Sequence, residues 1–110
     1  MMDISEQARR YIEAFNAHNI EALTDMLSEK VELKDWEVQL EGRATVLEHM
    51  RTIFNNVPAI RADVIDIISA KNACVLLLSI FIEEGVSLQV ADVLKFDTNG
   101  TIVSVHAYKR

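Results

Sequence analysis

Three polar residues of this chain, Tyr11, Asp35 and Asp92, have the chemistry that proton transfer requires, and Asp92 occupies the least expected place. Residues 86 to 96 read VSLQVADVLKF, in which every second side chain from the first onward is apolar except that of Asp92. Because a strand sends alternate side chains to opposite faces of its sheet, the pattern predicts an acid within a buried row. Loss of hydration disfavours an ionised carboxylate, so we expect Asp92 to be neutral and able to donate a hydrogen bond.

Tyr11 and Asp35 complete this set of polar groups. Tyr11 falls on the apolar side of a predicted helix and brings a second donor, whereas Asp35 lies in a polar segment between Lys34 and Trp36, where it can stay ionised. Two neutral donors in a dry cavity stabilise an oxygen on which negative charge develops, and a carboxylate can remove the proton. Each residue alone also has a simpler interpretation: Asp92 as a hydrogen-bonded structural acid or an acid at a subunit interface, Tyr11 as a core aromatic, and Asp35 as a solvated loop acid.

The first half of the chain has the apolar spacing of helices. This spacing predicts a first helix that follows Asp3 and runs to about residue 17, and a second, short helix from Asn19 to near residue 28. Residues 31–40 form a short extended segment that Gly42 closes. A third helix then ends at or just before Pro58, because proline cannot continue a helix.

The second half of the chain changes to a period of two. It predicts four strands, over residues 60–69, 73–83, 86–97 and 101–109. Turn signals at Glu84 and Gly85 and at Asn99 and Gly100 join the last three strands. Helices followed by an antiparallel meander predict one α+β domain over residues 1–110, with the helices packed on one face of a curved antiparallel sheet.

Composition limits the partners of the chain. It has 110 residues, with 17 acids against 11 bases and a formal net charge of -6, and no run of Lys or Arg. Nucleic acid and anionic membranes would be repelled, so we expect a small molecule or another protein as partner. The three histidines lie far apart and form no paired ligand motif, so neither a metal site nor a cofactor is expected.

Cysteine use and the amino-terminal sequence suggest a cytoplasmic protein. The lone Cys74 cannot form an internal disulfide, and its apolar neighbours indicate a buried, unreactive thiol. The start of the chain, MMDISEQARR, has no apolar core typical of a signal peptide. The most apolar run, CVLLLSIFI, is too short to span a bilayer as a helix.

Three stretches of the sequence resemble the ketosteroid isomerases within the nuclear-transport-factor-2-like (NTF2-like), or SnoaL-like, superfamily. They are ARRYIEAFNAHNIEALTDML, EGRATVLEHM and VADVLKFDTNGTIVSVHAY, and with their spacing they cover most of the chain. The resemblance implies a cone-shaped α+β fold with three amino-terminal helices, a pocket between helices and sheet, and a homodimer. The apolar run VLLLSIF, which has apolar residues on both faces of one strand, agrees with pairing through the sheet.

The same resemblance implies roles for individual residues. The tyrosine of the isomerases matches Tyr11, their catalytic aspartate matches Asp35, and their second aspartate matches Asp92. A family of this kind uses the first aspartate as a base and places the substrate oxygen between the tyrosine and the second aspartate, which its apolar surroundings keep protonated. Five further residues are expected to line the substrate pocket: Trp36, His49, Met50, Val103 and Val105.

Two alternatives remain open from the sequence. One is another enzyme of the same fold, a cyclase, dehydratase or hydrolase, in which Asp35 and His49 hold a water molecule. The other is a noncatalytic ligand-binding or dimerisation module, for which the polar residues are structural. A pocket that is too small, or filled by side chains, would favour this module.

Overall fold

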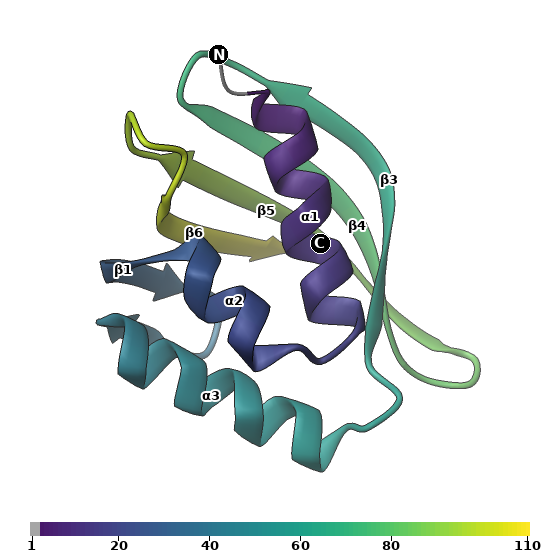
Figure 1. The fold of residues 1–110 in the computed structure, drawn as a ribbon. Coiled ribbons are helices and arrows are strands. Elements are labelled where there is room, and N and C mark those ends of the chain that lie inside the picture. The colour runs from purple at the N-terminus through teal and green to yellow at the C-terminus, as the bar shows by residue number, and fades with distance from the viewer. Residues whose placement is uncertain (1–2) are drawn as a thin grey trace.

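Three helices lie against one face of a curved sheet (Figure 1). The structure, a computed structural model, describes residues 3–110. The helices are α1 (Ile4–Asn16), α2 (Ile20–Met26) and α3 (Arg43–Asn56). The strands are β1 (Leu27–Lys34), β2 (Gln39–Glu41), β3 (Arg61–Ser69), β4 (Ala73–Glu83), β5 (Val86–Phe96) and β6 (Ile102–Lys109). The α+β cone expected from the sequence is therefore confirmed.

Side-chain caps begin the first two helices where the sequence predicts them. The Asp3 carboxylate accepts a hydrogen bond from the backbone N–H of Glu6 at 3.2 Å, and the Asn19 side chain accepts one from Ala22 at 3.0 Å. The third helix starts differently, after Gly42, whose φ of 93° lies in the left-handed region. The chain therefore enters α3 through a backbone conformation that glycine adopts easily and that would be strained for a residue with a side chain.

The sheet is mixed, in contrast to the wholly antiparallel sheet expected. Its strands lie in the order β2-β1-β6-β5-β4-β3, and the β1–β6 pair is parallel, with Leu33 opposite Val105. The segment expected to be simply extended in fact forms two strands, β1 and β2, which pair as a hairpin. The second helix also ends earlier than predicted, at Met26, because Leu27 already belongs to β1. The parallel pairing joins the first strand of the chain to its last.

Asn16 ties the end of α1 to the edge of the sheet. Its side-chain amide donates to the backbone oxygen of Ala62 at 2.8 Å and accepts from the backbone N–H of Ala62 at 2.7 Å. This pair of bonds replaces the partner that an edge strand lacks. The amino-terminal half of β3 is thereby held beneath the helix, and α1 is fixed over the sheet.

The core fills the space between the helices and the inner face of the sheet. Alternate residues of β5 from Val90 to Phe96 are buried, as the period of two predicts, and Asp92 is the one acid among them. The side chains that are essentially inaccessible to solvent come from several elements: Leu23, Leu27, Val31, Val46, Leu76, Leu78, Leu94 and Ile102. Within residues 3–110 no helix is long and apolar enough to cross a membrane.

Candidate active site

A small cavity of about 130 Å³ lies between α1, α3 and the inner face of the sheet. Tyr11, Asp35 and Asp92 all line it, although they come from a helix, a turn and a strand. The other lining side chains are mostly apolar: Phe15, Leu33, His49, Met50, Ile53, Ile60, Ile80, Val105 and Ala107. The structure therefore brings together the three polar residues singled out in the sequence, inside a largely hydrophobic wall.

Asp92 is placed in this cavity by the alternation of β5. It lies opposite Leu76 on β4 and Ala107 on β6, so apolar strands flank it on both sides. Its side chain is almost fully buried, and burial, together with the negative charge of Asp35, raises the pKa of Asp92 to about 7. A carboxyl group of this kind is largely protonated below neutral pH and can then act as a hydrogen-bond donor.

Tyr11 reaches the same cavity from the buried side of α1. The residue is 3% exposed, and burial, reinforced by the charge of Asp92, raises the pKa of its hydroxyl far above the ordinary value. The Tyr11 hydroxyl therefore keeps its proton at and around neutral pH. In the part of the chain that the structure describes, no hydrogen bond joins the Tyr11 hydroxyl or the Asp92 carboxyl to another side chain or to the backbone.

Asp35 is oriented by the turn that follows β1. Its Oδ1 accepts from the backbone N–H of Glu37 at 2.7 Å and of Val38 at 2.8 Å, and its own N–H donates to the oxygen of Val38 at 3.0 Å. One carboxylate oxygen is thus occupied by the turn, which leaves Oδ2 as the oxygen with free lone pairs. The residue is half-buried, in contrast to Asp92. The two acids accordingly have different surroundings at one site.

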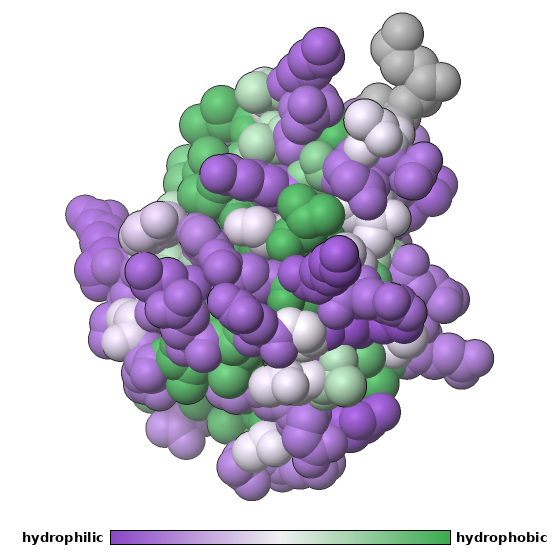
Figure 2. All heavy atoms as spheres, turned by 90° about the vertical axis from the view of Figure 1, so that its left-hand side faces the viewer, coloured by the Kyte–Doolittle hydropathy of each residue, from purple (hydrophilic) through white to green (hydrophobic). Residues whose placement is uncertain are grey.

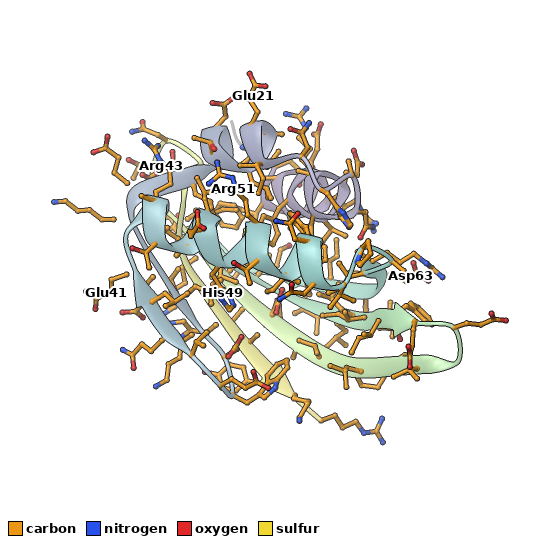
Figure 3. The ribbon with its side chains drawn as sticks, turned by 90° about the horizontal axis from the view of Figure 1, so that it is seen from below. Glu21, Glu41, Arg43, His49, Arg51 and Asp63 are labelled. Carbon is orange, nitrogen blue, oxygen red and sulfur yellow. The ribbon has the colours of Figure 1, made fainter. Side chains whose placement is uncertain are left out.

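The third helix supplies the opposite wall. His49 and Met50 both line the cavity, as the sequence predicts, and Figure 3 shows His49 pointing from α3 toward the sheet. Their neighbour one turn later, Ile53, contributes an apolar side chain. His49 is the one imidazole among the side chains that line this cavity, and its ring nitrogens can donate or accept a hydrogen bond there.

Two residues expected to line the pocket lie elsewhere. Trp36 is 41% exposed and sits outside the cavity, because the Asp35 turn directs the next residue away from it. Val103 is the extra residue at an irregularity in the β5–β6 pairing, where Ser104 lies opposite Lys95 but Ile102 lies opposite Phe96. This irregularity breaks the alternation assumed for the last strand, so Val105 lines the cavity and Val103 does not.

Several residues that line the cavity were not predicted from the sequence. Leu33 and Ala107 could have been found from strand alternation, since each lies two positions from a predicted site residue, Asp35 and Val105 respectively. Ile60 and Ile80 gave no such signal, because they come from just before β3 and from β4 and meet the site only through the curvature of the sheet. No group of three or more His, Cys, Asp or Glu side chains that could hold a metal ion occurs within residues 3–110.

The fold and the cavity define an α+β cone with a site enclosed between its helices and its sheet. The model of the SnoaL-like domain family matches residues 8–105, and the chain belongs to this family. No curated protein matches the chain in sequence.

Solved structures share the fold at low sequence identity. An NTF2-like protein of unknown function from Cytophaga hutchinsonii is 18% identical, with a TM-score of 0.86 over 100% of this chain and 92% of its own. A proposed ketosteroid isomerase from Kribbella flavida is 16% identical, with a TM-score of 0.85 over 97% of this chain and 77% of its own. A proposed polyketide cyclase from Sinorhizobium meliloti is 12% identical, with a TM-score of 0.82 over 97% and 94%. At these identities the similarity establishes the fold.

Proposed function

We propose that this protein catalyses a cofactor-independent shift of a double bond, by proton transfer next to a carbonyl group in a hydrophobic small molecule. Asp35 removes the proton, Tyr11 and protonated Asp92 donate hydrogen bonds to the carbonyl oxygen as it becomes negative, and Asp35 returns the proton at another carbon. The observation that carries the proposal is the convergence of these three groups on one largely apolar cavity. The activity is that of a ketosteroid-isomerase-like enzyme, as the resemblance in sequence implies.

The electrostatics of the cavity support this division of roles. A donor aimed at a developing oxyanion has its largest effect where water is excluded, and removal of one such donor typically costs about 10²- to 10³-fold in rate. Tyr11 and Asp92 are both buried, and the raised pKa of each favours the form that can donate. Asp35, at the half-buried rim of the same cavity, has an oxygen left to accept a proton.

The size of the cavity restricts the substrate. At about 130 Å³ it is smaller than the roughly 300–1,000 Å³ typical of sites that enclose a drug-sized ligand. A steroid could place only one ring in it. The reacting part of the substrate is therefore a small unsaturated ketone or a single ring of a larger molecule, and the remainder must extend beyond the cavity.

The direct test compares two unsaturated ketones of different size. The purified protein is incubated with 3-cyclohexenone and, separately, with a β,γ-unsaturated ketosteroid, and formation of the conjugated enone is followed by its ultraviolet absorbance. The Asp35→Asn variant keeps an oxygen for the turn but loses the base, so we expect its rate to fall by about 10²- to 10⁴-fold. Asp25→Asn, at an exposed position of α2, is the matched control. Equal rates for the wild type and Asp35→Asn would overturn the proposal.

A second candidate function is supported by His49. It lies in the same cavity as Asp35, and an imidazole and a carboxylate in one wall can together hold and activate a water molecule. A hydrolase or dehydratase of the same fold would use this pair. The variant His49→Gln distinguishes the two candidate activities. Double-bond isomerisation does not require the imidazole and should persist, whereas hydrolysis or dehydration should be lost.

The noncatalytic alternative is favoured by the same small volume. If the polar residues serve only ligand binding, neither ketone is converted, yet a phenol that mimics an enolate still binds. If the phenol also fails to bind, the cavity serves folding alone. The two assays together therefore distinguish an isomerase, a binding module and a structural cavity.

The proposal includes a homodimer formed through the outer face of the sheet. A shallow groove of about 430 Å³ there is lined by side chains of β3, β4 and β5, among them Ile65, which is 61% exposed, and also by Tyr108, Lys109 and Arg110. Figure 2 shows hydrophobic side chains gathered at its upper left, the side toward which this face turns. Ile65→Lys should convert a dimer to a monomer in light scattering. Asn55→Lys, which adds the same charge at an exposed position of α3 on the helical side of the sheet, should not. A monomeric wild type would contradict the dimer.

A further inference from the structure

A second hollow, which we call the notch, adjoins the cavity. It is lined by residues 34–36 and 106–109 and has a volume of about 290 Å³. Asp35 and Ala107 belong to the walls of both the notch and the cavity. A molecule whose reacting end occupies the cavity can therefore extend past Asp35 into the notch, and the two volumes together accommodate more than the cavity alone.

The notch exists because β1 leaves the sheet before β6 ends. The last parallel pair joins Lys34 to His106, after which the chain turns at Asp35. In contrast, β6 continues to pair with β5 as far as Lys109. Beyond His106 the side of β6 that faced β1 has no strand partner, so the hollow is a fixed consequence of the strand lengths.

The wall of the notch contains two lysines, Lys34 and Lys109, and one acid. Neither Lys34 nor Lys109 forms an ion pair with a residue in the described part of the chain, although the whole chain carries a net charge of -6. The one acid in its wall, Asp35, has Oδ1 occupied by the turn. His106 also lies in the wall, with Nε2 2.7 Å from Oε1 of Glu32, so its ring already has a partner within the chain.

Aromatic side chains add a flat surface beside these lysines. Trp36 forms part of the wall, and the Lys109 ammonium lies 5.4 Å from the centre of its ring. Tyr108, which is 60% exposed, lies on the same strand as Lys109. A planar apolar group could stack on Trp36 and carry an anion toward the two lysines.

We propose that the notch binds a carboxylate group of the substrate, which Lys34 and Lys109 recognise while the body of the molecule packs on Trp36. The substrate of the site is then an unsaturated carbonyl compound that carries a carboxylate a few bonds from the reacting carbon. The presence of a carbonyl group at the reacting end of the substrate rests on the proposed function. The binding of the carboxylate does not, because it uses residues outside the catalytic set.

Three small ligands test the notch. They are 3-(4-hydroxyphenyl)propanoate, 4-propylphenol, which lacks the carboxylate, and 3-phenylpropanoate, which lacks the hydroxyl. Binding is measured by calorimetry and by quenching of the fluorescence of Trp36, the single tryptophan of the chain. We expect 3-(4-hydroxyphenyl)propanoate to bind about tenfold more tightly than 4-propylphenol at low salt, and the advantage to shrink at about 0.5 M salt because the lysines are exposed.

Variants separate the lysines from the rest of the site. In Lys34→Gln/Lys109→Gln the advantage of the carboxylate should disappear while the affinity for 4-propylphenol stays the same. The matched control is Lys95→Gln, which removes an exposed lysine of β5 outside the notch. Retention of the full advantage in the double variant would overturn the proposal.

The outcomes also separate this proposal from the proposed function. Equal binding of 4-propylphenol and its carboxylate analogue would overturn the notch and leave the catalytic cavity standing. Lysine-dependent quenching by 3-phenylpropanoate, with no gain from the hydroxyl, would support the notch and count against the pair of donors in the cavity. Failure of all three ligands to bind would overturn both.

Discussion

Asp35 and Asp92 line one cavity, and the negative charge of Asp35 adds to the effect of burial in raising the pKa of Asp92 to about 7. Two carboxyl groups that face a common hollow are not easily ionised together. The half-buried acid, held by a turn, is the one suited to remain charged, and the acid on the apolar strand is the one suited to keep its proton. The pH dependence of both activity and stability is therefore expected to centre on Asp92.

The activity should depend on the protonation of Asp92. Because its pKa is about 7, the donor is present below neutral pH and is lost as the pH rises through that value. Initial rates should therefore fall between about pH 6 and pH 8 in the wild type. Asp92→Asn keeps a donor that does not titrate, so its rate should stay level across this range. A decline in the variant equal to that of the wild type would show that another group titrates.

The stability of the fold should depend on the same group. The pKa of Asp92 rises from 3.8 in the unfolded chain to about 7 in the folded one, so the folded state holds this proton more tightly. The contribution of the group to the free energy of unfolding is therefore fully present below about pH 4 and is lost as the pH rises toward 7. We therefore compare the free energy of unfolding of Asp92→Asn with that of the wild type at two pH values. The difference, variant minus wild type, should be roughly 2–4 kcal/mol larger at pH 8 than at pH 4. Urea unfolding at the two pH values measures this change, and a difference independent of pH would contradict it.

Tyr11 should affect the rate through its hydroxyl alone. Tyr11→Phe retains the ring within the core and removes one donor, so we expect kcat to fall by about 10²- to 10³-fold while the unfolding midpoint stays near that of the wild type. Thr52→Val, which removes an exposed hydroxyl of α3 outside the cavity and the notch, is the control and should retain its rate on the ketones. A loss of stability without a change in rate would mean that the Tyr11 hydroxyl serves the core.

Asn16 should hold the edge of the sheet to the first helix. Asn16→Ala leaves the backbone N–H and oxygen of Ala62 without their partners, and a buried polar group that loses its partner costs about 1–3 kcal/mol. Denaturant unfolding should show this loss. Asn55→Ala, at an exposed position near the end of α3, should change stability by less than about 0.5 kcal/mol. Equal effects of the two substitutions would remove the special role of Asn16.

Much of the fold could be predicted because its signals are local. The caps at Asp3 and Asn19 begin helices where expected, and the alternation of β5 places Asp92 on the inner face of the sheet. Each of these features depends on residues a few positions apart. The parallel pairing of β1 with β6 could not be predicted in this way, because it joins segments about seventy residues apart and leaves no periodic pattern in either.

The sequence by itself determined that an acid stands in a buried strand row, that a tyrosine lies on the inner side of the first helix, and that helices precede a meander. Only the tertiary structure decided that Asp35 faces the same cavity while its neighbour Trp36 lies outside, since a turn fixed by backbone hydrogen bonds separates them. It also decided that Val105, and not Val103, lines the site, because an irregularity in strand pairing shifts the faces of β6. Local spacing determines which face of an element is apolar, whereas the packing of distant elements determines what that face meets.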